Sequence, residues 1–243
     1  MKNRGVEYIG MKRAARVLPV IFLLVLAGAV AFSCASIPTT YYDAESAAED
    51  TEAPETAVEE ASGIGKTLVE GAYHIKHTQS LKIRDRTFNW DCTGTVLAVY
   101  YYAGIDLLPL MSEYSGNGVT RLYKALADRG LLYTTEYPKP GDIIFWDDTW
   151  DRNEDGRWND PLTHTGMVVH TSNWGTIDYV HLNYRRGIVF ERMNLKEPDV
   201  NRRQIEGDVV IINSPMRMRG EPEGKKWLAS HLYNAFGRGY ALP

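Results

Sequence analysis

The feature that most constrains the fold is a run of twelve residues, 92–103, that contains no charged side chain. The run reads Cys-Thr-Gly-Thr-Val-Leu-Ala-Val-Tyr-Tyr-Tyr-Ala, and it is followed by Gly104, a residue type that often ends a helix. A helix with no polar face must be covered by other elements on every side. We therefore expect one core to be built around it, and 243 residues with 44% hydrophobic content suffice for that.

The patterns before and after this run differ. Apolar residues at helical spacing predict helices over about 65–77 and 119–128. After Pro138 and Pro140 the chain changes to short β-rich runs, and a last helix is predicted around 226–234. The predicted strands cover residues 142–146, 165–171, 177–182, 187–192 and 209–213. This order predicts an α+β fold in one domain, residues 62–243, with N-terminal helices packed on an antiparallel β-sheet.

Residues 1–33 have the pattern of a signal peptide. Basic residues at 12, 13 and 16 precede an apolar run over 17–32 that ends in small residues before Cys34. These sixteen residues include Pro19 and are shorter than the ~20 that cross a bilayer comfortably, so export is favoured over a permanent membrane span. Residues 31–34 resemble a bacterial lipobox, which implies lipidation of Cys34; cleavage nearby by an ordinary signal peptidase is the alternative.

The segment 34–61 is predicted to be a disordered tether between the lipidated cysteine and the domain. Residues 35–61 contain eight Asp or Glu and no Lys or Arg, so the segment repels itself and buries little apolar surface. The remaining domain has 22 basic and 22 acidic residues. A neutral domain without a basic stripe argues against nucleic acid as a partner. The expected location is the bacterial cell envelope, with membrane attachment through the anchor.

Cys92 is the first candidate for chemistry. If Cys34 carries a lipid, Cys92 has no disulfide partner, because the chain has two cysteines. At the start of a helix the backbone N–H groups favour a thiolate and can receive an oxyanion. We therefore expect this position to lower the thiol pKa, although a buried core cysteine fits the position of Cys92 alone equally well.

Two histidines stand where a base and its partner would be needed. His164 opens a predicted strand, where it can face the start of the Cys92 helix and act as general base. His181 follows seventeen residues later in the next strand, where its ring can lie beside His164 and hold its tautomer. A loop role for His164 and a solvent-facing role for His181 are the alternatives. We interpret the other four histidines as structural or surface residues.

Four short motifs occur in an order that resembles the NlpC-like cell-wall cysteine peptidases and the related cysteine/histidine-dependent amidohydrolases. They are Asp91-Cys92-Thr93-Gly94, Pro140-Gly141-Asp142-Ile143-Ile144-Phe145, His164-Thr165-Gly166-Met167-Val168 and Val180-His181. The resemblance covers about 66–213 and implies a papain-like fold of the NlpC type. It also implies a triad in which Cys92 is the nucleophile, His164 the base and His181 the orienting residue.

The insert before His164 contains a candidate calcium loop. Oxygen-bearing side chains stand at its first, third and fifth positions and a glycine at the sixth, as in EF-hand loops, but its twelfth position is Leu162. An acidic turn without metal is the alternative. The candidate calcium ligands are Asp151, Asn153, Asp155, Arg157, Asn159 and Asp160.

These features together predict an exported, lipid-anchored cysteine peptidase or amidohydrolase that cleaves peptide or amide bonds of peptidoglycan. The expected partners are peptidoglycan stem peptides, and no cofactor is required apart from a candidate structural calcium. A muramoyl-alanine-type amidase, or an acyl transferase or thioesterase on the same fold, is one alternative. The other is an envelope-binding lipoprotein without catalytic activity.

Overall fold

The apolar run predicted as a buried helix forms α3 (Cys92–Tyr102), and every residue from 93 to 100 is buried. The computed structural model describes residues 61–76, 78–217 and 226–242. All of its helices and strands belong to one compact unit, residues 44–243. The predicted signal peptide, Cys34 and nearly all of the predicted tether lie outside the described residues.

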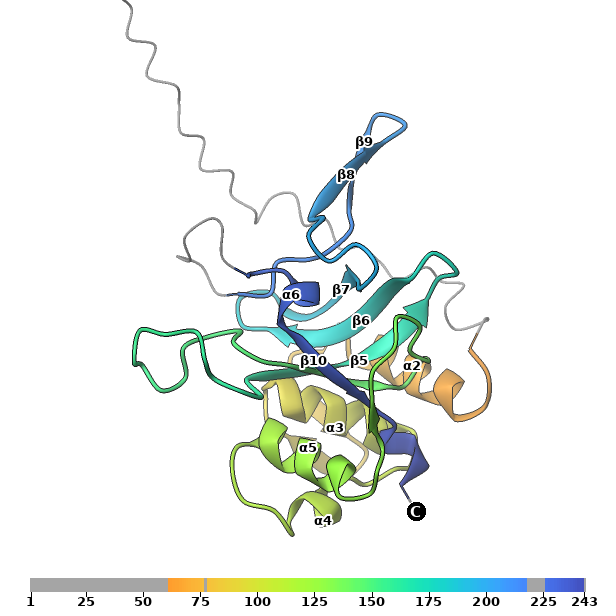
Figure 1. The fold of residues 1–243 in the computed structure, drawn as a ribbon. Helices are drawn as coiled ribbons and strands as arrows, with labels where there is room; N and C mark the ends of the chain where they lie inside the picture. Colours follow the sequence, from red (N-terminus) through yellow and green to blue (C-terminus); the bar gives the residue numbers. More distant parts are fainter. Residues whose placement is uncertain (1–60, 77, 218–225, 243) are drawn as a thin grey trace, which may run out of the picture. The chain divides into compact units, whose positions relative to one another are not determined.

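A six-stranded antiparallel sheet packs against α3 (Figure 1). Its strand order is β3-β10-β4-β5-β6-β7, so the last strand of the chain lies between two earlier ones. Each pair of neighbours is antiparallel. The strands are β3 (Leu132–Tyr133), β4 (Ile143–Trp146), β5 (His164–Thr171), β6 (Thr176–Asn183), β7 (Gly187–Asn194) and β10 (Tyr233–Gly237).

The two faces of this sheet are covered differently. One face packs on α2 (Gly63–Ile75), α3 and α5 (Gly118–Ala127) and forms the larger hydrophobic core. The other face packs on the single-turn helix α6 (Ala229–Leu232) and carries a smaller core around the buried side chain of Trp146. Because successive residues of a strand point to opposite faces, both cores draw on the same strands.

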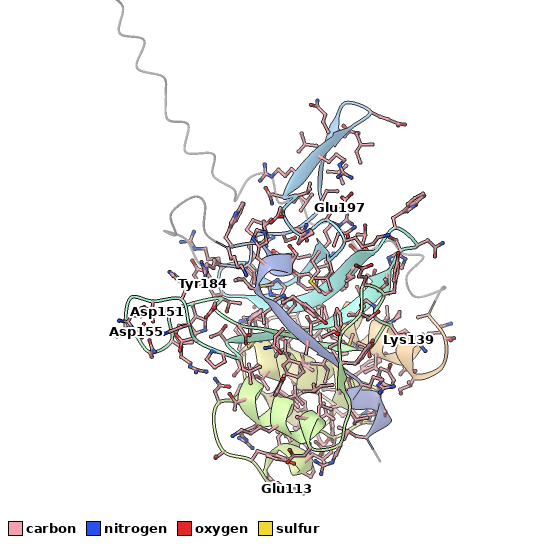
Figure 2. The ribbon with its side chains drawn as sticks, in the orientation of Figure 1. Glu113, Lys139, Asp151, Asp155, Tyr184 and Glu197 are labelled. Carbon is pink, nitrogen blue, oxygen red and sulfur yellow. The ribbon has the colours of Figure 1, made fainter. Side chains whose placement is uncertain are left out.

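The remaining elements are short. They are the hairpin β1 (Leu81–Ile83) and β2 (Arg86–Phe88), the helix α4 (Leu108–Met111), the hairpin β8 (Arg202–Ile205) and β9 (Asp208–Ile211), and the 3-10 helix η1 (Gly239–Ala241). The hairpin of β8 and β9 projects from the six-stranded sheet (Figure 1). Glu197 lies near its base, in the segment between β7 and β8 (Figure 2).

The architecture mixes helices with antiparallel sheets, as the predicted α+β class requires. The three long helices and the four strands between 142 and 194 lie where they were predicted, within a few residues. The prediction of a helix over 226–234 was wrong, because only one helical turn forms before β10 begins at Tyr233. β10 is paired on both edges, and its Phe236 is fully buried, which outweighs the local pattern.

Candidate active site

Cys92 is the first residue of α3, and Asp91 is its N-cap. The Asp91 backbone is extended, with φ −148° and ψ 176°, and its Oδ1 accepts a hydrogen bond from the Gly94 N–H at 2.6 Å. The Asp91 carbonyl also accepts from the Thr95 hydroxyl at 2.9 Å. This cap uses one of the N–H groups that a helix start leaves without an internal acceptor. Of the other three, the Asp91 N–H donates to the Asn89 carbonyl at 2.9 Å, and the remaining two belong to Cys92 and Thr93.

Gly94 allows the preceding segment to fold back across the start of α3. A Cβ atom at this position would lie only 1.9 Å from the carbonyl oxygen of Asn89. Any side chain would therefore push residues 89–91 away from the helix and move the cap. The absence of a side chain at Gly94 is therefore required by the path of the chain itself.

His164 begins β5 and is held by the strand beside it. It pairs with Trp146 of β4, and the two rings lie 5.7 Å apart between centroids. Before it, the Thr163 N–H donates to the Trp146 carbonyl at 3.0 Å, and the Leu162 N–H donates to Oδ1 of Asp147 at 2.7 Å. The two residues before His164 are thus held by the last residue of β4 and by Asp147, which follows that strand.

His181 lies beside His164, as predicted from the hairpin of β5 and β6. The Nε2 of His164 and the Nδ1 of His181 are 2.8 Å apart, a hydrogen-bond distance. Gly166 makes this approach possible, because a Cβ there would lie 2.7 Å from the Val180 carbonyl oxygen and 3.2 Å from the Cβ of His181. His181 is buried, with 3% of its surface exposed, so the alternative of a solvent-facing strand residue is wrong.

The Cys92 thiol lies at the backbone of Thr165, the residue after His164. Among the residues that the structure describes, no hydrogen bond joins the thiol to the His164 ring. Such bonds are often long in enzymes without substrate and shorten when substrate binds. The structure therefore brings the predicted nucleophile and base to the same end of β5 without linking them directly.

The thiol pKa departs from the expectation based on the helix start alone. Burial and, after it, the nearby charge of Asp91 raise the pKa of Cys92 to about 11, although the backbone of Thr165 and the Thr93 hydroxyl act in the opposite direction. The prediction of a lowered pKa was wrong, because desolvation of the thiolate outweighs the helix N-terminus. At neutral pH the resting thiol is protonated.

The base has the opposite direction of shift. Burial, followed by the neighbouring His181 ring, holds the pKa of His164 well below its usual value. His164 is therefore neutral near pH 7 and can accept a proton. A protonated thiol and a neutral imidazole require that any proton transfer between them take place during the reaction, not before it.

One acidic residue of this site was missed by the sequence reasoning. Glu191 of β7 is 5% exposed, and its Oε2 lies 3.1 Å from Nε2 of His181. In the β6–β7 register it lies opposite Tyr179, and so on the same face of the sheet as His181. The signal was present in the sequence as a single acid directly after the apolar run 188–190, but only strand register connects it to His181.

The candidate calcium loop lies between β4 and β5, with Asp151 and Asp155 in its exposed part (Figure 2). Its side-chain oxygens accept hydrogen bonds from the loop's own backbone: Asp151 from the N–H groups of residues 155 and 156, and Asp155 from that of residue 157. The carboxylate of Asp160 is buried and accepts from the Arg152 N–H at 2.8 Å.

A calcium ion in this loop stays a prediction. Of the six candidates, the structure connects Asp151, Asn153 and Asp155 through the turn, whereas Asp160 bonds to the backbone of Arg152 and Asn153. Within the described parts of the chain, no group of three or more His, Cys, Asp and Glu side chains is arranged to hold a metal ion. The three residues connected through the turn supply two carboxylates and one amide.

The remaining described histidines have structural surroundings. His170 contacts the buried carboxylate of Asp178 at 3.2 Å, His231 contacts Asp199 at 2.9 Å, and the exposed ring of His74 stacks near Tyr102. Separately, a pocket of about 560 Å³ is lined by residues 147, 148, 158, 217, 226 and 231–233, and none of Cys92, His164 and His181 lines it.

In residues 61–76, 78–217 and 226–242, none of the helices is both long and apolar enough to cross a membrane. No protein-family model, curated protein or solved structure matches this chain.

Proposed function

We propose that this chain is a papain-like, NlpC-type cysteine hydrolase that cleaves peptide or amide bonds in bacterial peptidoglycan. The observation that carries the proposal is the 2.8 Å contact between the rings of His164 and His181, at the end of β5 where the Cys92 thiol meets the Thr165 backbone. A thiol at a helix start, a neutral imidazole at the same end of β5 and a second group that holds this imidazole are the parts that covalent acyl transfer needs.

In the first half of the reaction, the Cys92 sulfur attacks the carbonyl carbon of an amide while its proton passes to the His164 ring. The carbonyl π electrons move to oxygen, and the N–H groups of Cys92 and Thr93 stabilise that oxyanion. The C–N bond then breaks, and His164 gives its proton to the leaving amine. The product is a thioester between Cys92 and the acyl part of the substrate.

In the second half, water attacks the thioester and His164 accepts a proton from it. The C–S bond breaks, the acid product leaves, and Cys92 regains its proton from His164. The reaction consumes one water and needs no redox partner. Peptidoglycan stem peptides are the proposed substrate, because the predicted lipid anchor and the tether of 34–61 would hold the domain beside the cell wall.

The test is mass spectrometry of fragments released from purified peptidoglycan by the full-length chain. We expect defined fragments that name the bond, and their loss in Cys92→Ala and His164→Ala. His74→Ala is the matched control, since it removes an exposed histidine on α2 that has no part in the site. If neither the peptide bonds of the stem nor the amide bond between sugar and peptide is cleaved, the proposal fails. An acyl-transfer substrate or a binding role then takes its place.

A further inference from the structure

The charge on Glu191 is kept in place by three neighbours. Its Oε1 contacts the guanidinium of Arg186, and its Oε2 accepts a hydrogen bond from the Tyr179 hydroxyl at 3.4 Å. Its Oε2 also lies 3.1 Å from Nε2 of His181, although the ring N–H does not point straight at that oxygen. Tyr179, His181 and Glu191 are all buried, so solvent does not compete for these contacts.

These contacts determine whether the carboxylate is charged. Burial by itself raises the pKa of Glu191, but its interactions with His181 and Arg186 outweigh it, and the pKa lies below its usual value. Glu191 is therefore ionised at neutral pH. An ionised carboxylate can only accept hydrogen bonds, and it has no proton to donate.

The Glu191 carboxylate determines which nitrogen carries the proton in each of the two histidine rings. With Glu191 on one side, His181 carries its proton on Nε2, and its Nδ1 is left as an acceptor. His164 must then donate from its own Nε2 across the 2.8 Å contact. The remaining nitrogen of His164, Nδ1, has a free lone pair in this tautomer and is the atom able to take the thiol proton.

We infer that Glu191 is a positioning residue of this site, which acts through His181 to keep His164 in the tautomer that accepts a proton from Cys92. The inference rests on the proposed function for its biological meaning. Glu191 touches neither the substrate nor the thiol. Arg186 and Tyr179 serve it by holding the carboxylate in place and in its ionised form.

Glu191→Gln is the informative variant because it keeps the shape of the side chain and reverses which nitrogen of each histidine ring carries the proton. Arg186 can only donate, so the amide oxygen turns toward it and the amide NH₂ turns toward His181. His181 must then accept at Nε2 and carry its proton on Nδ1, and His164 is left with a proton on the nitrogen that should receive one. A wrong tautomer of this kind disables a base without displacing it.

The matched control is Asp178→Asn, which also replaces a buried carboxylate by an amide. Asp178 lies on β6, directly before Tyr179. Asp178 is also buried and also contacts an arginine and a histidine: Arg192 Nε at 3.1 Å and His170 Nδ1 at 3.2 Å. It points to the opposite face of the sheet from Tyr179, away from His181. A general loss of stability will appear in both variants, whereas a tautomer effect will appear only in Glu191→Gln.

The first measurement uses ¹⁵N-labelled full-length protein and histidine side-chain NMR near pH 7. We expect protons on Nε2 of both His164 and His181 in the unmodified protein and in Asp178→Asn, and on Nδ1 of both in Glu191→Gln. A proton on Nδ1 of either ring in the unmodified protein overturns the inference without any variant being needed. Glu191→Asp, which keeps the carboxylate, should keep the original tautomers.

The second measurement is the rate at which iodoacetamide alkylates Cys92 near neutral pH. We expect Glu191→Gln to lower it at least about tenfold and Asp178→Asn to leave it within about twofold. Equal effects of the two variants, or no effect of either, overturn the inference. If the tautomers and alkylation behave as expected but peptidoglycan is not cleaved, the proposed function fails and the proton order stands.

Discussion

At the scale of single residues, Asp91 has two separate effects at the start of α3. Its Oδ1 caps α3 through the Gly94 N–H, and its charge, after burial, raises the pKa of the Cys92 thiol. Asp91→Asn keeps an oxygen acceptor and removes the charge. We therefore expect the pH midpoint of Cys92 alkylation to move down from about 11, with stability changed by less than about 1 kcal/mol.

Asp91→Ala removes both the cap and the charge, so its comparison with Asp91→Asn separates the two effects. The pH midpoint of alkylation should move in the same direction as in Asp91→Asn, while the free energy of unfolding falls by about 1 kcal/mol. An unchanged or higher midpoint in Asp91→Asn would show that burial alone controls the thiol.

At the scale of elements, β10 closes the sheet from the far end of the chain. It lies between β3 and β4, and its Phe236 is fully buried against the smaller core. Phe236→Ala leaves a cavity there, and we expect the free energy of unfolding in urea to fall by about 3–5 kcal/mol.

Val209→Ala is the comparison, because Val209 belongs to the projecting β8–β9 hairpin and is 64% exposed. It should change stability by less than about 0.5 kcal/mol. Similar small changes in both variants would mean that β10 contributes little to the core.

The loop between β4 and β5 gives a second prediction at this scale. If it binds calcium, free calcium at about 100 times the Kd stabilises the folded state by about 2.7 kcal/mol, and the melting temperature rises. Differential scanning calorimetry with calcium and with a chelator measures this. Asp151→Asn should abolish the rise and Asp208→Asn, in the β8–β9 hairpin, should keep it; a melting temperature independent of calcium would leave the loop as an acidic turn.

At the scale of the whole molecule, His164 links stability to pH. Its pKa in the folded state lies well below its usual value because of burial, so the folded state binds fewer protons than the unfolded state in mild acid. Above about pH 6.5 His164 costs no stability. As the pH falls below about 6.5, the free energy of unfolding decreases by up to about 1.4 kcal/mol per pH unit until the folded-state pKa of His164 is reached.

We expect urea unfolding at pH 7 and pH 5 to show this loss. His164→Asn, which cannot take up the proton, should lose up to about 2 kcal/mol less than the unmodified protein over the same interval. Equal losses in the two proteins would place the responsible group elsewhere.

The sequence by itself was sufficient for features that depend on neighbours along the chain. The charge-free run from Cys92 predicted α3, because an apolar helix has no alternative to burial. The β-rich runs around His164 and His181 predicted their strands, and an antiparallel hairpin of that spacing places the two rings side by side. Helix starts, strand periods and hairpins are local, so pattern and capping reveal them.

Only the tertiary structure decided the features that depend on distant segments. The pairing of β10 between β3 and β4 overrode a helical pattern, and the register of β6 with β7 brought Glu191 to His181. The raised pKa of Cys92 has the same origin, because desolvation depends on everything packed around the thiol, while a helix start is visible in a few residues. The sequence therefore determined which residues carry the proposed chemistry, and the packing of distant segments determined their protonation and its control.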